Sequence, residues 1–370
     1  MSRAREFADL AGSADAGGIT GRNLVINGAY QVFQRATAAT TADGGYNTAD
    51  RWRMGEAGDG AYTTERSTDH PNGSGYSLKA QVTTADTSVA AGHYAYIYQQ
   101  IEAQNLQHLL YGTSAAKTLT LSFFVKSNKT GIYVFDLRKP DNTHLHYNEE
   151  FTISSANTWE KKTITIVPDS NVTASGGAIA NDNGSGLEVG IGLKWGSTYT
   201  GGTSGSWSTN SNDYATSNQV NWMDSTSNNF YLTEVQLEVG DKATPFEHRS
   251  FADELHRCHR YFQGQGTTAA ALDASGNTKQ TAIFANGKLA STGSSTYHRL
   301  QVPMQTRMRS APTAYVSDNN GTLGKAYYNG ANATVTTYIA TETTVVFRPQ
   351  AAATSTATDI WINYSLESEL

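Results

Sequence analysis

The chain has 370 residues, of which 16% are charged, and its formal net charge is −6 at pH 7. This weak acidity excludes a basic surface for nucleic acid, and no apolar run approaches the roughly 20 residues that a membrane helix needs. The single cysteine, Cys258, excludes an internal disulfide framework.

The first 22 residues predict a short docking segment. Ala4, Phe7 and Leu10 recur at helical spacing, but a helix this short is marginal in water unless it docks on a partner. The small, Gly-rich residues 11–21 then predict a linker. We therefore expect residues 1–22 to form a helical N-terminal anchor.

Residues 23–248 predict an antiparallel β-sandwich. Asn23–Arg35 indicates an opening strand pair around an Asn27-Gly28 turn, and Lys117–Lys126 alternates apolar and polar residues as a half-buried strand does. Regular short strands separated by Gly, Ser and Asn clusters favour a sandwich. The other strands expected here are Tyr76–Val82, His93–Ile101, Gly131–Arg138, Trp159–Val167 and Leu187–Trp195.

Tyr199–Trp222 predicts a long loop, because it is poor in aliphatic residues and rich in Gly, Ser, Thr and Asn. Aromatic rings on polar loops can stack on sugar faces while neighbouring amides and hydroxyls bond the sugar. The alternative is that the rings belong to the core or to a subunit interface. The candidate glycan-binding residues are Trp195, Tyr199, Trp207, Tyr214, Trp222, Tyr327 and Tyr328.

A strand is predicted from Phe230 to Val239, where the residues alternate with a period of two. Gly240 and Pro245 end it, since proline cannot donate to a ladder. We expect one unbroken alternation along this strand. It places Phe230, Leu232, Glu234, Gln236 and Glu238 on one face and the intervening residues on the other.

A helix follows in residues 249–263. Ser250 with Asp253 has the form of a capping box. The apolar residues fall on one helical face, which we expect to pack against a neighbouring domain or subunit. They are Phe251, Leu255, Cys258 and Phe262.

Residues 264–370 predict a second, distal β-sandwich built from further short strands, which include Thr313–Val316 and Thr334–Ile339. The expected fold is thus all-β, with two antiparallel β-sandwich domains, at 23–248 and 264–370, joined by the linker helix at 249–263.

No metal, cofactor or enzymatic activity is predicted. The two clusters that imitate metal sites are His144-Leu-His146 with Glu150, and His256 with Cys258 and His259. The first lacks the flanking glycines and a later histidine in a matching strand. The second lacks the partner pair that a closed four-ligand zinc site needs. Nucleophile-elbow and phosphate-loop motifs are also missing.

The stretch Glu-Val-Gln-Leu-Glu-Val-Gly at 234–240, with Ala-Thr-Pro-Phe-Glu-His-Arg-Ser-Phe at 243–251 and Glu-Leu-His-Arg-Cys-His-Arg-Tyr-Phe at 254–262, closely resembles a module of bacteriophage tail-fibre and related virion proteins. The resemblance extends to Asn23–Arg35 and to the C-terminal residues 362–370. It implies a carbohydrate-binding-module-like jelly roll joined to a distal β domain. In such modules an acidic residue after Asn-Gly often helps to hold calcium; Gln31 stands nearby here, so no ion is expected.

The resemblance implies a fibre on the virion surface that attaches to host glycans and is a homotrimer, and the missing disulfide and the apolar helix face also favour assembly. From their spacing we expect Ala4, Phe7 and Leu10 to contact other virion proteins. Two alternatives remain open. One is a purely structural virion component, such as a capsid or collar fibre or a decoration protein. The other is a glycan-degrading spike, for which the expected sequence repeat is missing.

Overall fold

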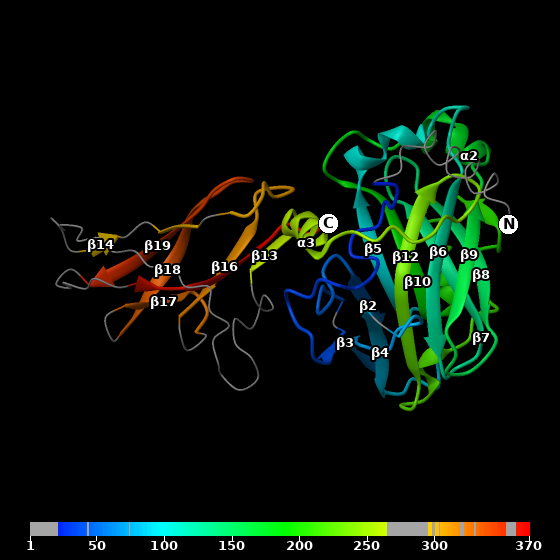
Figure 1. The fold of residues 1–370 in the computed structure, drawn as a ribbon, viewed down its shortest axis with the longest axis horizontal. Helices are drawn as coiled ribbons and strands as arrows, with labels where there is room; N and C mark the ends of the chain where they lie inside the picture. Colours follow the sequence, from blue (N-terminus) through cyan, green and yellow to red (C-terminus); the bar gives the residue numbers. More distant parts are fainter. Residues whose placement is uncertain are drawn as a thin grey trace. The chain divides into compact units, whose positions relative to one another are not determined.

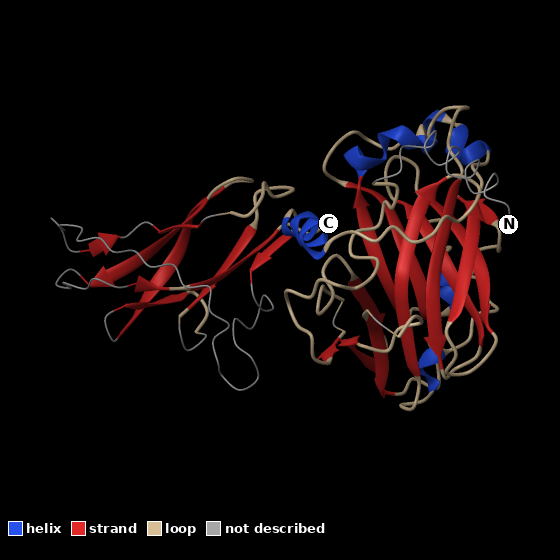
Figure 2. Ribbon diagram, viewed as in Figure 1, coloured by secondary structure: helices blue, strands red, loops and turns tan. Residues whose placement is uncertain are grey.

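The computed structural model describes residues 21–42, 44–73, 75–264, 295–297, 300–302, 304–318, 322–328, 331–352 and 360–370. The predicted anchor residues Ala4, Phe7 and Leu10 lie outside these ranges. The described chain is mainly antiparallel β-sheet, which confirms the all-β fold class (Figure 2). It divides into two compact units, of which the second comprises Gln34–Ala36 and Ala252–Glu369.

The first unit is a sandwich of two six-stranded antiparallel sheets (Figure 1). We name them after their central strands. The β12 sheet contains, in spatial order, β1 (Thr40–Thr41), β3 (Ala61–Ser67), β4 (Ser77–Thr84), β12 (Asn229–Val239), β6 (Leu119–Ser127) and β9 (Glu160–Ile166). The β10 sheet contains β11 (Ser206–Ser208), β8 (Leu145–Ile153), β7 (Gly131–Lys139), β10 (Ser185–Trp195), β5 (Tyr94–Glu102) and β2 (Arg53–Ala57).

Short helical turns close the ends of this sandwich. They are η1 (Ala103–Leu109), α2 (Ser170–Thr173), η2 (Ser175–Gly177), η3 (Ser197–Tyr199) and η4 (Trp222–Asp224). The carboxylate of Asp169 caps α2 by accepting the backbone N–H groups of Asn171 and Val172, which is the N-cap role that aspartate favours. In the described part of the chain, no helix is long and apolar enough to cross a membrane.

The core lies between the two sheets, where every second residue of each strand points inward. In β6 these are Leu119, Leu121, Phe123 and Val125, all fully buried. Apolar side chains of β10 belong to the same core cluster. The alternation read from Lys117–Lys126 is therefore confirmed, because one face of each sheet must leave water.

The expected unbroken alternation of β12 is wrong. Phe230 and Leu232 are buried, but so are Val235 and Leu237. A β-bulge lies between Thr233 and Gln236, where two residues of β12 stand opposite Phe123 alone, and Glu234 has φ 50°. A bulge adds one residue and shifts the side-chain phase of the strand. The inward face therefore changes parity in the middle of β12.

The Asn23 side chain pairs with the backbone beside this bulge. Its Nδ2 donates to the Val235 carbonyl at 3.1 Å, and its Oδ1 accepts the Leu237 N–H at 3.2 Å. The Leu24 N–H donates to the Leu237 carbonyl, and the Gly28 carbonyl accepts the Val235 N–H. Asn23–Gly28 thus lies along β12 as an irregular segment, and the expected opening strand pair does not form. The Asn27-Gly28 turn is present, with Asn27 at φ 58°.

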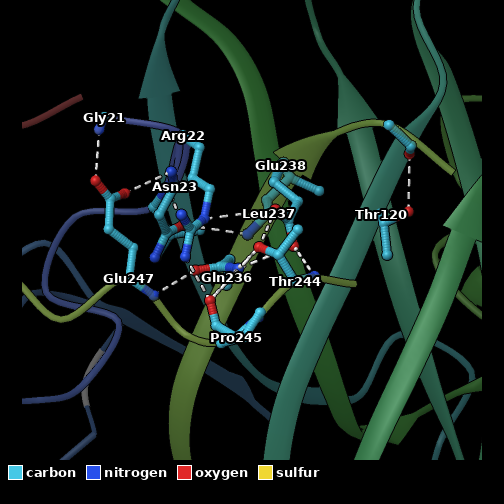
Figure 3. A network of polar contacts seen from close by, with 12 residues as sticks. Gly21, Arg22, Asn23, Thr120, Gln236, Leu237, Glu238, Thr244, Pro245 and Glu247 are labelled. Carbon is cyan, nitrogen blue, oxygen red and sulfur yellow. Dashed lines mark hydrogen bonds and ion pairs between the residues drawn. The ribbon is translucent and has the colours of Figure 1, made fainter. Parts of the chain in front are cut away.

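A network of polar contacts joins this segment to the chain that follows β12 (Figure 3). The Glu247 carboxylate accepts the Gly21 and Asn23 N–H groups at 2.5 and 2.8 Å. The Glu238 carboxylate accepts both the N–H and the hydroxyl of Thr244, at 2.9 and 2.6 Å. The Gln236 side-chain oxygen accepts the Glu247 N–H at 2.8 Å. The polar side chains of Gln236, Glu238 and Glu247 therefore stabilise the local fold.

The second unit also contains two sheets, a three-stranded one and a larger one. The strands of the first are β13 (Phe262–Gly264), β21 (Asn363–Glu367) and β16 (Thr313–Ser317). Those of the second are β14 (Ser295–Tyr297), β19 (Val345–Ala352), β18 (Ala331–Ala340), β17 (Lys325–Tyr328) and β20 (Ile360–Trp361), with β15 (Leu300–Val302) also paired to β19. Phe347, Leu366 and Met308 are among the fully buried residues of its core.

The predicted helix is α3 (Phe251–His259). On its apolar face Cys258 is buried, Leu255 is half-buried and Phe251 is 57% exposed. The expected place of Phe262 on this helix is wrong, because α3 ends at His259 and the buried Phe262 begins β13. Packing of this face against another domain or subunit stays a prediction. Within the second unit, the Arg35 guanidinium lies over the Phe262 ring, with 3.8 Å from Cζ to the ring centroid.

We predict that Gly28→Ala destabilises the first unit by about 1–3 kcal/mol. A Cβ at this position would lie 2.1 Å from the Val235 carbonyl oxygen, and backbone in the middle of a sheet cannot move aside. Urea denaturation measures the loss. Gly92→Ala is the matched control, since a Cβ there meets no atom within 4 Å. Equal stabilities of the two variants would contradict the close approach.

Candidate functional site

The outer face of the β10 sheet carries most of the polar and aromatic side chains discussed below. On β5 the core takes Ala95, Ile97 and Gln99, so Tyr96 and Tyr98 point outward. Facing them on β10 are Gly190 and Gly192, paired with Tyr98 and Tyr96 respectively. Two glycines in the middle of a strand leave room for other groups to approach the sheet.

Trp195 reaches this face because of a second β-bulge. The register of β10 against β5 shifts between Gly192 and Lys194, so that Trp195 stands opposite Tyr94. Without the extra residue, the Trp195 side chain would point into the core, as the buried side chains of Ile191 and Leu193 do. A Cβ at Gly192 would lie 2.2 Å from Trp195 Nε1, so the indole lies directly against this glycine.

A buried ion cluster supports the bulge. Lys194 Nζ and His93 Nδ1 each lie 2.8 Å from Asp86 Oδ2, and the Lys194 side chain is fully buried. Burial alone would raise the pKa of Asp86, but the hydrogen bonds from Lys194 and His93 outweigh it and lower that pKa. The cluster holds the residues that directly precede Tyr94 and Trp195 in the chain.

Five half-buried aromatic rings from three segments then meet beside Gly192. We call them the aromatic cluster: Tyr94 and Tyr96 from β5, Trp195 from the end of β10, and Tyr199 and Tyr214 from the segment that follows. Trp195 is the centre, with ring centroids 4.9 Å from Tyr96 and Tyr214, 5.4 Å from Tyr199 and 5.8 Å from Tyr94. The Tyr214 ring is stacked on the indole at an interplanar angle of 25°.

Residues 196–221 bring Tyr199 and Tyr214 over the β10 sheet. The Ala215 N–H donates to the Tyr199 carbonyl, the Gly202 N–H donates to the Ala215 carbonyl, and Ser204 bridges to Asn148 of β8. β11 adds a further strand to the same sheet. The expected long loop is therefore largely irregular but not free of regular structure.

A row of charged residues lies next to the aromatic cluster. Arg138 Nη1 contacts Glu188 Oε2 at 3.1 Å across β7 and β10, and Glu188 is 1% exposed. Asp136 Oδ1 lies 2.9 Å from His146 Nδ1 and accepts Asn148 Nδ2 at 3.1 Å. Each buried charge thus has an opposite partner, as burial in a low-dielectric interior requires.

Burial and the paired charges together set the pKa values of this row. It raises the pKa of Glu188 to about 7, although Arg138 acts in the opposite direction. For His146, burial alone would lower the pKa, but the charge and hydrogen bond of Asp136 outweigh it and raise the pKa. Burial likewise raises the pKa of Tyr214 to about 12.

Seven buried polar atoms on this face have no hydrogen-bond partner among the described residues. Leaving a buried donor or acceptor unpaired costs about 1–3 kcal/mol, and natural folds contain few such atoms. The seven atoms on this face lie beside the aromatic cluster and can donate to or accept from a polar group placed there. The atoms are Arg138 Nε, His146 Nε2, Asn148 Oδ1, Glu188 Oε1, Trp195 Nε1, and Nε2 and Oε1 of Gln219.

The structure brings together three of the seven predicted glycan-binding residues, Trp195, Tyr199 and Tyr214. For Trp207 and Trp222 the prediction is wrong, since they are 8% and 0% exposed and offer no ring face to a ligand. Trp207 packs against Tyr147, and Trp222 against Tyr62. The sequence context is equally polar around all five, and the tertiary structure decides which rings reach the surface; for Trp195 the bulge in β10 does so.

The remaining candidates lie in β17. The backbone of Tyr327 and Tyr328 belongs to this strand, but their side chains lie outside the described residues. The reading of the sequence missed Tyr94, Tyr96 and Tyr98. Their spacing of two on a predicted strand is the signal that could have found them, because it puts all three on one face.

The histidine clusters also have local roles. His146 belongs to the charged row, while Glu150 Oε1 accepts the Thr216 hydroxyl at 2.5 Å and the Asn218 amide at 3.0 Å. On the part of the chain that the structure describes, no group of three or more His, Cys, Asp or Glu residues could hold a metal ion.

No protein-family model matches the sequence, and no curated protein is similar to it. Solved structures similar to the chain include the enzymatically active domain of tailspike protein 4 from bacteriophage CBA120, at 13% identity and a TM-score of 0.30. That match covers 59% of this chain and 22% of the tailspike chain.

Two further similar structures are carbohydrate-related. A putative sugar-binding protein from Bacteroides thetaiotaomicron matches at 11% identity and a TM-score of 0.34, over 59% of this chain and 100% of its own. The family 11 carbohydrate-binding module of a Clostridium thermocellum cellulase matches at 12% identity and a TM-score of 0.29, over 57% of this chain and 99% of its own. Likenesses this distant do not establish what this chain binds.

We predict that Glu188 makes stability fall as the pH rises. Its folded-state pKa of about 7 lies above its ordinary value of 4.5. Its contribution to the free energy of unfolding is therefore fully present below about pH 4.5 and is lost through pH 7. Urea denaturation across this range measures the fall, and Glu188→Gln is expected to reduce it.

Glu160→Gln is the control for this titration. Burial alone would raise the pKa of Glu160, but its hydrogen bonds, led by that from Lys162, lower it. Its contribution is therefore lost only as the pH falls through that lowered pKa, and the variant should keep the wild-type slope near pH 7. An unchanged slope in Glu188→Gln would contradict the assignment.

Proposed function

We propose that the first unit binds glycans on the outer face of the β10 sheet. The observation that carries the proposal is the convergence of the aromatic cluster with a row of buried polar atoms that lack partners. Rings stack on the apolar faces of sugars, and amides, carboxylates and guanidinium groups bond the sugar hydroxyls. These are the two components that a sugar-binding surface needs.

The alternative is a purely structural virion component whose aromatic rings contact only other proteins. Protein interfaces are also rich in Tyr and Trp, so the rings alone do not separate the two functions. The polar atoms favour a glycan, because protein interface cores are depleted in charged residues. Here Glu188 and Asp136 are buried beside the rings.

We propose further that the chain is a virion fibre protein and that glycan binding serves attachment to the host surface. The support is the sequence resemblance of residues 234–262 to phage tail-fibre proteins. Trimeric assembly and attachment through Ala4, Phe7 and Leu10 come from that resemblance and from the helical spacing of these residues. Linked copies would strengthen weak glycan binding through avidity.

We predict that Trp195→Ala weakens glycan binding about tenfold or more, since it removes the ring that every other member of the cluster contacts. A glycan array followed by calorimetry measures the loss. Trp159→Ala is the matched control, because Trp159 pairs with Tyr231 on the β12 sheet. Equal losses in both variants, or no glycan binding at all, would contradict the proposed site.

For the virion role, we predict that a chain without residues 1–10 stays trimeric in solution but is not incorporated into particles. The reason is that these residues would contact the virion while the folded units hold the trimer. Light scattering measures the oligomer, and immunoblotting of purified particles measures incorporation. Full incorporation of the shortened chain would show that attachment lies elsewhere, and a stable full-length monomer would refute the trimer.

A further inference from the structure

The ring of Tyr214 covers the middle of the proposed glycan face. It is stacked on Trp195, lies 4.5 Å from the His146 ring between centroids, and lies 6.2 Å from Tyr96. The Arg138 Cζ atom is 5.9 Å from its centroid. One side chain from outside the strands thus contacts residues of β5, β7, β8 and β10.

Little besides stacking holds this ring in place. Among the described residues, the Tyr214 side chain makes no hydrogen bond. The preceding residue, Asp213, bonds only to residues close to it in the sequence. Its carboxylate accepts the Ser208 hydroxyl at 2.6 Å and the Asn210 amide at 2.8 Å. Residues 209–214 therefore form a local unit outside the strand pairs, joined to β11 through Ser208.

The ring is also a poor chemical match for the polar groups around it. The unpaired donors are Arg138 Nε, Trp195 Nε1 and Gln219 Nε2; the unpaired acceptors are Glu188 Oε1, Asn148 Oδ1 and Gln219 Oε1. His146 Nε2 is an acceptor in the neutral ring and a donor in the charged one. A phenyl ring can satisfy none of these atoms.

The charge balance of the face restricts the ligand. Arg138 is paired with Glu188, and Asp136 with His146, so the buried cations are already neutralised. An anionic sugar in the place of Tyr214 would meet the buried carboxylates of Asp136 and Glu188, which is costly in a low-dielectric site. The further cation of this face is Arg53, which lies at the Tyr98 ring, with 5.7 Å from Cζ to the ring centroid. Hydroxyl groups both donate and accept, and they suit a site with similar numbers of donors and acceptors.

We propose that Tyr214 occupies the place of a sugar ring, and that an uncharged, hydroxyl-rich sugar ring displaces it and stacks on Trp195. This inference rests on the proposed glycan binding and names its ligand class and its subsite. The tyrosine ring, with its one hydroxyl, leaves the seven buried polar atoms unpaired, whereas a sugar ring with several hydroxyls can bond them. The ligand therefore competes with Tyr214 for one position.

The test uses the full chain and a glycan array in which neutral oligosaccharides are paired with their uronic-acid and sialylated counterparts, followed by calorimetry on the best ligand. We expect wild type to bind neutral members and to reject the charged ones. Tyr214→Ala is expected to raise the affinity about tenfold, because removing a competing ring increases the population of open sites.

Three variants complete the design. Tyr214→Phe keeps the ring and should retain the wild-type affinity, so it controls for the hydroxyl. Tyr231→Ala removes a tyrosine from the other sheet and should change nothing. Trp195→Ala should weaken binding about tenfold or more, as predicted above. Thermal unfolding of each variant shows that it is folded, and Tyr214→Ser is the substitute if Tyr214→Ala is not.

The outcomes separate the two proposals. If Tyr214→Ala and Tyr214→Ser weaken binding as Trp195→Ala does, Tyr214 is part of the binding platform and the displacement is refuted, while glycan binding stands. Preferential binding of the charged glycans would refute the ligand class in the same way. If wild type and every folded Tyr214 variant bind no glycan, both proposals are refuted.

Discussion

The first unit depends on the hydrogen bonds that the Asn23 side chain makes to β12. On the edge that faces β4, β12 has a strand partner only as far as Leu232, and the bulge against β6 follows directly. Asn23 supplies a donor to the Val235 carbonyl and an acceptor to the Leu237 N–H. Backbone groups buried in a sandwich must be paired, and the Asn23 side chain supplies this pairing together with the backbone of Leu24 and Gly28.

The contacts around Asn23 also explain why residues 234–247 contain so many polar side chains. The side chains of Gln236, Glu238 and Glu247 are all hydrogen-bonded to backbone or hydroxyl groups of their own chain, so their role is structural. They bring the start of the first unit and the chain after β12 to the same strand (Figure 3). A motif can therefore be specific for a fold while saying nothing about a ligand.

The candidate site also depends on a β-bulge, which here places a side chain on the surface. In β10 a bulge turns Trp195 outward, and a fully buried lysine with Asp86 and His93 keeps it there. Beside it, the buried carboxylates of Glu188 and Asp136 pair with Arg138 and His146. Burial raises the pKa of Glu188 to about 7. The result is a polar face with two buried ion pairs, whose middle is covered by the Tyr214 ring. We propose that this face binds hydroxyl groups rather than ions.

The sequence by itself determined the fold class and most of the strands. A period of two is a local property, and Lys117–Lys126 or Leu187–Trp195 shows it without reference to any partner. The helix at Phe251–His259 was readable for the same reason, from a period near four. The polar segment at Tyr199–Trp222 and its aromatic residues could also be identified.

Only the tertiary structure decided which of those rings face outward. Trp195 and Trp222 stand in similar sequence surroundings, but a bulge turns the first to the surface and the second fills the core beside Tyr62. The charged row is equally nonlocal, since Asp136, His146 and Glu188 come from three strands. Bulges shift parity by one residue, and strand pairing joins distant segments, so neither is visible in the local period of the sequence.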